Sequence, residues 1–280
     1  MHRKTWNDAV DRWVLTTNHK RDHEKDLIKL KWLGNYLSGL LLTEISLDLI
    51  FTIGYEKKLE TSPSTANRYL ALLRAILRAA RDYWGWIDHA PKVRLFKEPE
   101  PRVRWLKRAE AARLIKELPP HLSKMAAFTL STGLRQHNVS YLRWSQIDLD
   151  RRLAIIPASE SKNNRPITVP LNSDAMNILN SVSNDHDEYC FVYNRAPVDR
   201  TSTKAWAAAK KRANIQDFRW HDLRHTWASW HVQRGTSLQE LQLLGGWKTF
   251  QMVLRYAHLS GDHLVAAAKR IETGDQLPLF

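Results

Sequence analysis

Apolar residues recur at intervals of three and four through the first eighty residues, and the alternation typical of strands is almost absent there. This period predicts amphipathic helices, with capping or turn-forming residues between them. The predicted helices follow a cap at Thr5, run over 22–37, follow a cap at Ser46 over 47–59, and extend from a cap at Ser64 or Thr65 to about Tyr83. The first part of the chain is therefore expected to be a helical domain.

The last of these helices divides its side chains most clearly into two faces. Its apolar face carries Leu70, Leu73, Ile76 and Leu77, and its polar face carries Asn67, Arg74, Arg78 and Arg81. A charged helical face is usually solvated surface, but in a basic chain the same face also suits contact with DNA. Both interpretations are open at the level of the sequence.

Residues 91–101 combine prolines with basic side chains and show neither helical nor strand period. This composition predicts an extended, basic linker. The domain boundary is expected near Arg102, which gives a first domain over 1–101 and a second over 102–280.

From Trp105 onward the pattern mixes helical and strand-like segments. Two short β-type runs, 153–156 and 167–169, flank the polar segment 159–165 and predict a hairpin. Helices are predicted over 107–118, 122–131, 172–182, 203–213, 221–233, 237–244 and 264–271. The predicted fold class is mainly α with a small β-sheet, an α+β arrangement.

The charge of the chain indicates what kind of partner it binds, because the 280 residues carry a formal net charge of +14. Such an excess favours a polyanion, nucleic acid before a membrane surface, although it also suits a protein that needs the charge only for solubility. Cys190 is the single cysteine, which excludes an intramolecular disulfide and fits a reducing compartment. The start of the chain lacks an apolar secretory segment, and no run approaches the ~20 apolar residues of a membrane span, so a cytoplasmic protein is expected.

Three separated motifs supply side chains suited to a phosphodiester. Thr132-Gly133-Leu134-Arg135 and His221-Asp222-Leu223-Arg224-His225 supply two guanidiniums and an imidazole, and segment 245–259 places Tyr256 after a Gly-Gly turn and a short helix. Arginine donates two hydrogen bonds to non-bridging oxygens and keeps its charge. A lone tyrosine is most often a half-buried core residue, but its position after both arginine motifs favours a nucleophile.

With these motifs in this order, the chain resembles the tyrosine recombinases, also called phage-type integrases, over most of its length. The resemblance implies a core-type DNA-binding domain joined by a basic linker to a catalytic domain, the two clamping a duplex. It assigns the catalytic arginines to Arg135 and Arg224, proton handling to His221, the general acid to Lys162, and the nucleophile that forms a 3′-phosphotyrosine to Tyr256. The bond energy stays in that ester, so the resemblance implies no cofactor, no metal and no ATP.

The chain departs from the commoner family pattern at Trp247, nine residues before the tyrosine, where the family usually has histidine and some members have tryptophan. An indole N–H donates a hydrogen bond but does not exchange protons at neutral pH, so Trp247 is expected to orient and pack. Lys162 taken alone is also typical of an ordinary turn, and Arg165 is a rival cation beside it. His225 and His258 are expected to serve in local hydrogen bonding or packing.

Other functions fit the sequence less well. Segment 221–225 nearly matches a zinc-protease helix motif, but it lacks the glutamate and places an arginine beside the metal, so no metal site is predicted. The leading interpretation is a site-specific DNA recombinase, specifically a prophage or mobile-element integrase. The alternatives are a DNA-binding regulator on the same scaffold and a type IB topoisomerase; the full catalytic set argues against the first, and the N-terminal helical domain and short length against the second.

The resemblance also implies partners. These are double-stranded DNA recombination sites and further copies of the chain in a homo-tetramer assembled on DNA, with accessory directionality or DNA-bending proteins as additional candidates and no membrane. The separate arm-binding module of some phage integrases is expected to be missing. The apolar tail 277–280 is expected either to fold back on its own domain or to dock into a neighbouring protomer.

Overall fold

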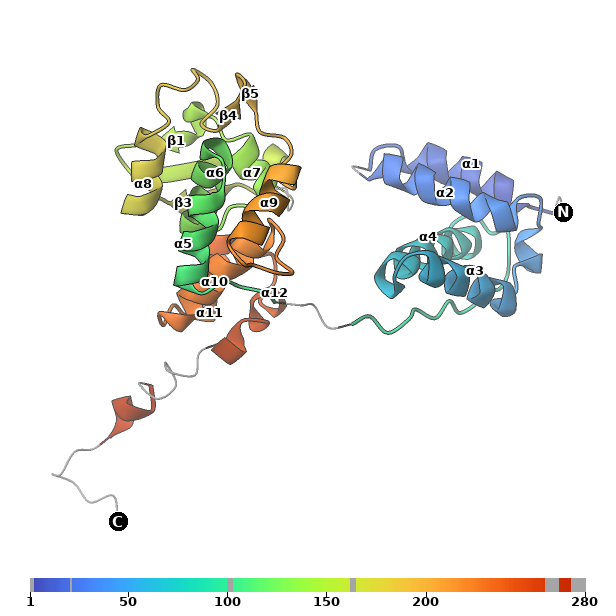
Figure 1. The fold of residues 1–280 in the computed structure, drawn as a ribbon. Helices are drawn as coiled ribbons and strands as arrows, with labels where there is room; N and C mark the ends of the chain where they lie inside the picture. Colours follow the sequence, from blue (N-terminus) through green and yellow to red (C-terminus); the bar gives the residue numbers. More distant parts are fainter. Residues whose placement is uncertain (1–2, 21, 100–102, 162–164, 260–266, 273–280) are drawn as a thin grey trace, which may run out of the picture. The chain divides into compact units, whose positions relative to one another are not determined.

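The computed structural model describes residues 3–20, 22–99, 103–161, 165–259 and 267–272 (Figure 1). Its contacts divide the chain into two compact units, Met1–Pro101 and Arg102–Phe280. Helices dominate both units, and the described strands lie in the second (Figure 1). The predicted fold class, mainly α with a small sheet, is confirmed.

The first unit is built from helices whose starting points the sequence marks with capping residues. Its helices are α1 (Trp6–Thr17), α2 (His23–Leu37), α3 (Leu47–Glu60) and α4 (Pro63–Asp82), with the short 3-10 helix η1 (Leu42–Glu44) between α2 and α3. The predicted caps at Thr5 and Ser46 are confirmed, because the hydroxyl of each accepts a backbone N–H in the first turn that follows.

Helix α4 begins earlier than predicted and organises the first unit. Its cap is Ser62, whose hydroxyl accepts the N–H of Thr65, so the prediction of a cap at Ser64 or Thr65 is wrong. Pro63 takes the first helical position, where a missing N–H has no cost. The predicted apolar face is confirmed, since its residues are buried and α4 contacts all three other helices of the unit.

The segment 91–99 has no helix or strand, as expected of a linker, but it is bound to the first unit. Val93 is buried and Phe96 packs on the core. Asn67 holds the segment, because its Nδ2 donates to the Phe96 carbonyl (2.9 Å) and to Glu98 (2.7 Å) while its Oδ1 accepts the Phe96 N–H (2.8 Å). Asn67 is only 5% exposed, so the prediction that it shares an exposed polar face with the arginines of α4 is wrong.

In the second unit, helix α6 contacts α5, α7, α8 and α10 and lies at the centre of the core. The α-helices are α5 (Arg108–Glu117), α6 (Pro120–Thr132), α7 (Gln136–Ser140), α8 (Ser173–Asn180), α9 (Lys204–Arg212), α10 (Asp222–Gln233), α11 (Leu238–Gly245) and α12 (Gln251–Leu254). The 3-10 helices are η2 (Trp144–Gln146), η3 (Ala158–Glu160), η4 (Ala257–Leu259) and η5 (Lys269–Ile271). The predicted helices before residue 245 each match one of these within a few residues.

A small antiparallel sheet with the strand order β1-β2-β3 lies in the second unit. Its strands are β1 (Ile147–Asp148), β2 (Leu153–Ile156) and β3 (Ile167–Pro170), and a separate pair is formed by β4 (Val192–Tyr193) and β5 (Ala196–Pro197). The predicted hairpin is β2–β3, in which Ile156 pairs with Ile167. Ala154 and Ile156 are buried while Ile155 between them is exposed, the alternation that a half-buried strand requires. Strand β1 is too short for its pattern to predict it.

Three further expectations concern single segments. Within the described residues, no helix has both the length and the apolar character that crossing a bilayer requires. Cys190, the single cysteine, is a core residue, and burial raises the pKa of its thiol to about 12. The predicted helix over 264–271 begins outside the described residues, and the tail 277–280 lies outside them.

Replacing Asn67 with alanine is expected to loosen the linker from the first unit. The change leaves the Phe96 N–H and carbonyl without their side-chain partner, a loss of about 2 kcal/mol that raises the opened population about thirtyfold. The measurement is the rate at which trypsin cleaves the full chain after Arg94 and Lys97. Ser64→Ala, which removes one exposed bond to Glu98, is the matched control, and equal cleavage rates in the two variants would contradict the role of Asn67.

Candidate active site

Arg224 is the anchor of the candidate site. It lies in the first turn of α10 and is 5% exposed. Its two terminal nitrogens donate to the carbonyl oxygens of Gly133, at the end of α6, and of Gly245, at the end of α11. Its guanidinium carbon lies 4.2 Å from the centre of the Trp247 ring. One buried cation therefore joins three helices and the turn that leads to Tyr256.

Arg135 reaches the site from the turn between α6 and α7. Gly133 ends α6 with φ +66°, a left-handed conformation that glycine adopts at little cost, and Arg135 stands just before α7. Within the described structure, Nη1 of Arg135 is buried and has no hydrogen-bond partner. Burial also lowers the pKa of Arg135. A buried donor of this kind is suited to a ligand that brings an acceptor.

The electrostatics of the two arginines point to the same kind of ligand. Burial, and after it the charge of Arg135, lower the pKa of Arg224 to about 9, while Tyr256 acts in the opposite direction. Both guanidiniums still carry their charge at neutral pH, but each is destabilised by the loss of water and by the other. An anion between them would relieve both effects, so the pair is suited to a phosphate or another oxyanion.

Tyr256 is buried, with 1% of its surface exposed, and its hydroxyl oxygen lies 2.5 Å from Nδ1 of His225. Burial raises the pKa of Tyr256 to about 12, against the opposing charges of Arg224 and Arg255. Burial lowers the pKa of His225 to about 4, and the nearby His221, Arg255 and Arg224 contribute smaller effects in the same direction. At neutral pH a protonated tyrosine therefore faces a neutral imidazole.

Trp247 forms a side of the site by packing, as its indole chemistry predicts. Its ring is 6.0 Å from the ring of Tyr256 and 6.1 Å from that of Trp227, measured between centroids. Its backbone N–H bonds to the carbonyl of Gln242, which fixes the turn after α11. The indole therefore contacts Arg224 and lies near the tyrosine ring at the same time.

The two residues predicted to transfer protons, His221 and Lys162, are not part of the buried centre that the structure describes. His221 directly precedes α10, is exposed, and has its ring 5.1 Å from that of His225 in an edge-to-face arrangement. It therefore lies next to the site without being part of its buried centre. Lys162 lies outside the described residues, and Arg165, its rival in the sequence, is exposed at the start of the segment that leads into β3.

Two residues of the site were not identified as such from the sequence. His225 is expected there only as a local hydrogen-bonding or packing residue, and the structure supplies its partner, the hydroxyl of Tyr256. Its spacing of four from His221 on a helix is the signal that places it on the same side. Trp227 is the second, because its ring lies directly against Gly133. Nothing in its local sequence pattern distinguishes it from a core tryptophan.

The arginines of α4 in the first unit have different surroundings. Arg81 is exposed and paired with Asp82, whose carboxylate lies 2.6 Å from its Nε. Arg74 and Arg78 line a hollow of about 630 Å³, together with Trp13 and Trp84. The predicted DNA-binding set thus divides into two arginines at a hollow, one arginine in an exposed ion pair, and the buried Asn67.

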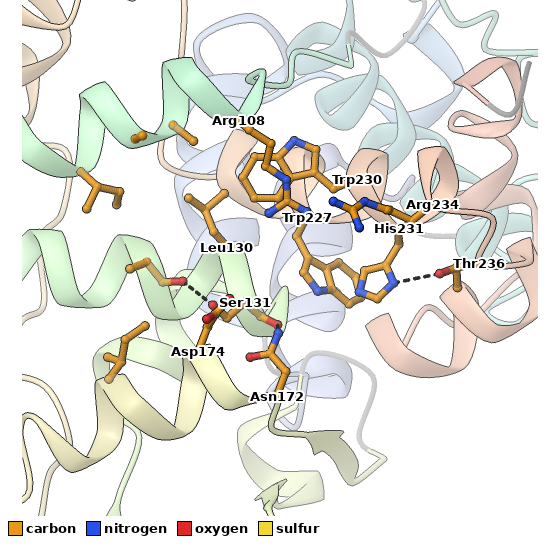
Figure 2. Close-up of a pocket in the computed structure, with 15 residues that line it drawn as sticks. Arg108, Leu130, Ser131, Asn172, Asp174, Trp227, Trp230, His231, Arg234 and Thr236 are labelled. Carbon is orange, nitrogen blue, oxygen red and sulfur yellow. Dashed lines mark hydrogen bonds between the residues drawn. The ribbon is translucent and has the colours of Figure 1, made fainter. Parts of the chain in front are cut away.

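A separate cavity of about 830 Å³ lies in the second unit (Figure 2). Arg108, Trp230, His231 and Arg234 line it, and His231 bonds there to Thr236 (Figure 2). None of the predicted catalytic residues is among its described lining residues. Trp227 belongs to both the cavity and the site, because it lines the cavity and its ring stacks on the indole of Trp247.

Comparisons with known proteins show which family the chain resembles. The sequence pattern of the phage integrase family matches residues 104–263. The integrase of Salmonella phage P22 is 34% identical over 96% of this chain and 80% of its own length, and the shufflon-specific DNA recombinase of Escherichia coli is 29% identical over 95% and 72%. Among solved structures, a lambda integrase tetramer bound to a Holliday junction has a TM-score of 0.75 at 19% identity, covering 91% of this chain and 78% of that one.

Replacing Gly133 with alanine is expected to disrupt the site at its turn. The added Cβ would lie 2.3 Å from the Trp227 ring at a φ of +66°, so steric overlap adds to backbone strain. The free energy of unfolding of the second unit is expected to fall by about 3 kcal/mol or more. Gly85→Ala is the matched control, because its φ is +61° and nothing lies within 4 Å of the added atom.

Urea denaturation of the full-length variants measures both losses. The control is expected to lose only the strain, about 1–2 kcal/mol from the first unit. Equal losses in the two variants would mean that Trp227 moves aside without cost, which contradicts a packed wall at this turn.

Proposed function

The chain belongs to the phage integrase family and is a tyrosine recombinase, and on this premise we propose that it breaks and rejoins DNA at the site around Tyr256. The tyrosine hydroxyl attacks the phosphorus of a phosphodiester, the bond to the 5′ oxygen breaks, and the strand is held as a 3′-phosphotyrosine. The 5′ hydroxyl of another strand then attacks that ester and releases the tyrosine. The number of phosphoester bonds stays constant, so the reaction needs no ATP.

The observation that carries this proposal is the buried guanidinium of Arg224, which lies near Tyr256 and close enough to the partly buried Arg135 to be affected by its charge. Nη1 of Arg135 is buried without a partner in the described residues, and Arg224 is a buried cation whose pKa is lowered to about 9. A phosphodiester supplies one negative charge and two non-bridging oxygens that accept from guanidinium N–H groups. Further negative charge develops in the transition state, and the same groups stabilise it without reorganising.

The remaining roles follow from the chemistry of the side chains. Trp247 orients Arg224 and the tyrosine by packing against both. His221, at the exposed edge of the site, is suited to proton exchange with the solvent or with the DNA. Lys162 remains the sequence-based candidate for the acid that protonates the 5′ oxygen.

The proposal extends to assembly and to the two units. The lambda integrase neighbour is a tetramer on a Holliday junction, which supports a homo-tetramer on double-stranded DNA for this chain. The shufflon-specific DNA recombinase supports exchange at specific sites. We assign the first unit, 1–101, to core-type DNA binding and the second, 102–280, to catalysis. Accessory directionality or DNA-bending proteins remain a prediction from the resemblance.

Replacing Tyr256 with phenylalanine is expected to abolish the covalent protein–DNA adduct and leave duplex binding intact, because only the hydroxyl is the nucleophile. The substrates are nicked duplexes tiled across the junction between the encoding element and its host DNA. The adduct is measured by its retarded migration under denaturing conditions, in EDTA and without ATP, since the arginines take the place of a metal ion.

Two outcomes would contradict this part of the proposal. A Tyr256→Phe variant that forms the adduct in undiminished yield would move the nucleophile to another residue. Loss of the wild-type adduct in EDTA, with recovery on addition of magnesium, would make the reaction metal-dependent.

Arg74 and Arg78 are the cations of the first unit that we assign to DNA. They line one hollow with aromatic side chains, while Arg81 is already neutralised by Asp82. Asn67 is not included, because its amide groups are bound to the linker. Positive side chains at such a hollow are suited to phosphates of the DNA backbone.

Arg74→Ala combined with Arg78→Ala is expected to weaken duplex binding and flatten its dependence on salt. Each lost phosphate contact lowers the slope of log affinity against log salt by about 0.9, so the pair lowers it by up to about 1.8. Lys31→Ala with Lys116→Ala removes the same charge from exposed positions on α2 and α5 and serves as the control. Slopes that change equally in the two double variants would show a general charge effect in place of a contact surface.

A further inference from the structure

The hydroxyl proton of Tyr256 has one acceptor at hydrogen-bond distance in the described structure. Nδ1 of His225 lies 2.5 Å from the hydroxyl oxygen, and both side chains are buried. The nearby Arg224 and Arg255 carry only N–H donors and cannot accept a proton. A neutral imidazole with its own hydrogen on Nε2 accepts the hydroxyl hydrogen at Nδ1, and a proton transfer from Tyr256 requires this tautomer.

We propose that His225 is a catalytic residue, the general base that takes the proton from Tyr256 when the tyrosine attacks DNA. This inference rests on the proposed function of the site. It assigns the proton of the nucleophile to a buried side chain next to Arg224, and not to His221, which lies at the exposed edge.

The step conserves protons and electrons. A lone pair of the tyrosine oxygen forms the bond to phosphorus, the bond from phosphorus to the 5′ oxygen breaks, and that oxygen keeps the bonding pair and is protonated by the general acid. The hydroxyl proton moves to Nδ1 of His225, which becomes an imidazolium. During rejoining, the 5′ hydroxyl attacks phosphorus and returns its proton to the general acid. The bond from phosphorus to the tyrosine oxygen breaks, and the proton on Nδ1 returns to that oxygen, so the site is restored.

The charges around His225 prepare it for this role and tie the role to DNA. The charged or titratable groups that act on His225 or Tyr256 are His221 just before α10, Asp222 and Arg224 on α10, and Arg255 beside the tyrosine, while Arg135 acts in turn on Arg224. Burial, and after it the charges of this set, keep the imidazole unprotonated before DNA binds. A bound phosphodiester adds a negative charge, which raises the affinity of His225 for a proton as the reaction needs it.

Asparagine at position 225 separates proton transfer from hydrogen bonding. Its Oδ1 lies where the ring has Nδ1, so His225→Asn keeps an acceptor for the hydroxyl but cannot carry the proton away. The rate of adduct formation in a single turnover is expected to fall about 10²- to 10⁴-fold at neutral pH. In the variant the proton goes to solvent hydroxide, so log rate rises with pH with a slope of about one, whereas the wild-type rate is flat above the pKa of its base.

His231→Asn is the matched control. His231 lies on the same helix, and its Nδ1 is 3.0 Å from the Thr236 hydroxyl, but it lines the separate cavity of Figure 2. Its replacement is expected to leave the rate and its pH dependence unchanged. Duplex affinity and thermal unfolding of both variants are measured in parallel, and His225→Gln serves as a second variant without a titratable ring if His225→Asn does not fold.

The outcomes separate this inference from the proposed function. An adduct in the wild type and none in Tyr256→Phe establishes the nucleophile, whatever happens at position 225. With the nucleophile established, a His225→Asn or His225→Gln rate that falls equally at every pH gives His225 a positioning role and overturns the general-base assignment. An unchanged rate overturns it as well. Absence of a wild-type adduct on every tiled duplex counts against the proposed function first.

Discussion

The bonds from Arg224 to two helix ends hold the second unit's functional region together. Its guanidinium donates to carbonyls that close α6 and α11, and carbonyls at a helix C-terminus carry partial negative charge. Each such end stabilises a nearby cation by up to about 2 kcal/mol in partly buried geometries. Helix ends therefore take the place of a carboxylate, and the arginine is held without having its charge cancelled.

This arrangement explains why the site combines burial with positive charge. A carboxylate partner would neutralise Arg224 and leave little attraction for a second anion, whereas carbonyl groups fix its position and leave its full charge. The same fixed point holds Trp247 against the guanidinium, and the indole in turn packs on the ring of Tyr256. The position of the tyrosine thus depends on the arginine through side chains as well as through the chain itself.

Much of the fold and of the candidate site could be predicted from the sequence, because these features depend on residues close together in the chain. The caps at Thr5 and Ser46, the alternation in β2 and the spacing of apolar residues in α4 each depend on residues a few positions apart. The set around Tyr256 was recognised from the order of three motifs, which needs no knowledge of distances.

The remainder depends on contacts between distant segments, which no local pattern encodes. Asn67 has the same helical spacing as the arginines of α4, yet the linker some thirty residues later covers it. The pairing of His225 with Tyr256 arises because α10 and the turn after α12 meet in the core. The cap of α4 is a different case, because the sequence does contain the signal: a proline directly after Ser62 is typical of a helix start. Three neighbouring residues with hydroxyl groups are competing candidates for the same cap.

The burial of Tyr256, the proposed nucleophile, also bears on the lifetime of broken DNA. A phosphotyrosine ester is open to hydrolysis, and a water molecule that attacked it would free the enzyme and leave a permanent nick in the strand. With 1% of its surface exposed and Trp247 packed over it, the tyrosine lies where bulk water has little access. A strand end guided by the duplex reaches phosphorus in a fixed geometry, while water would have to enter by displacing packed rings. The site therefore favours repair of the break over its loss to the solvent.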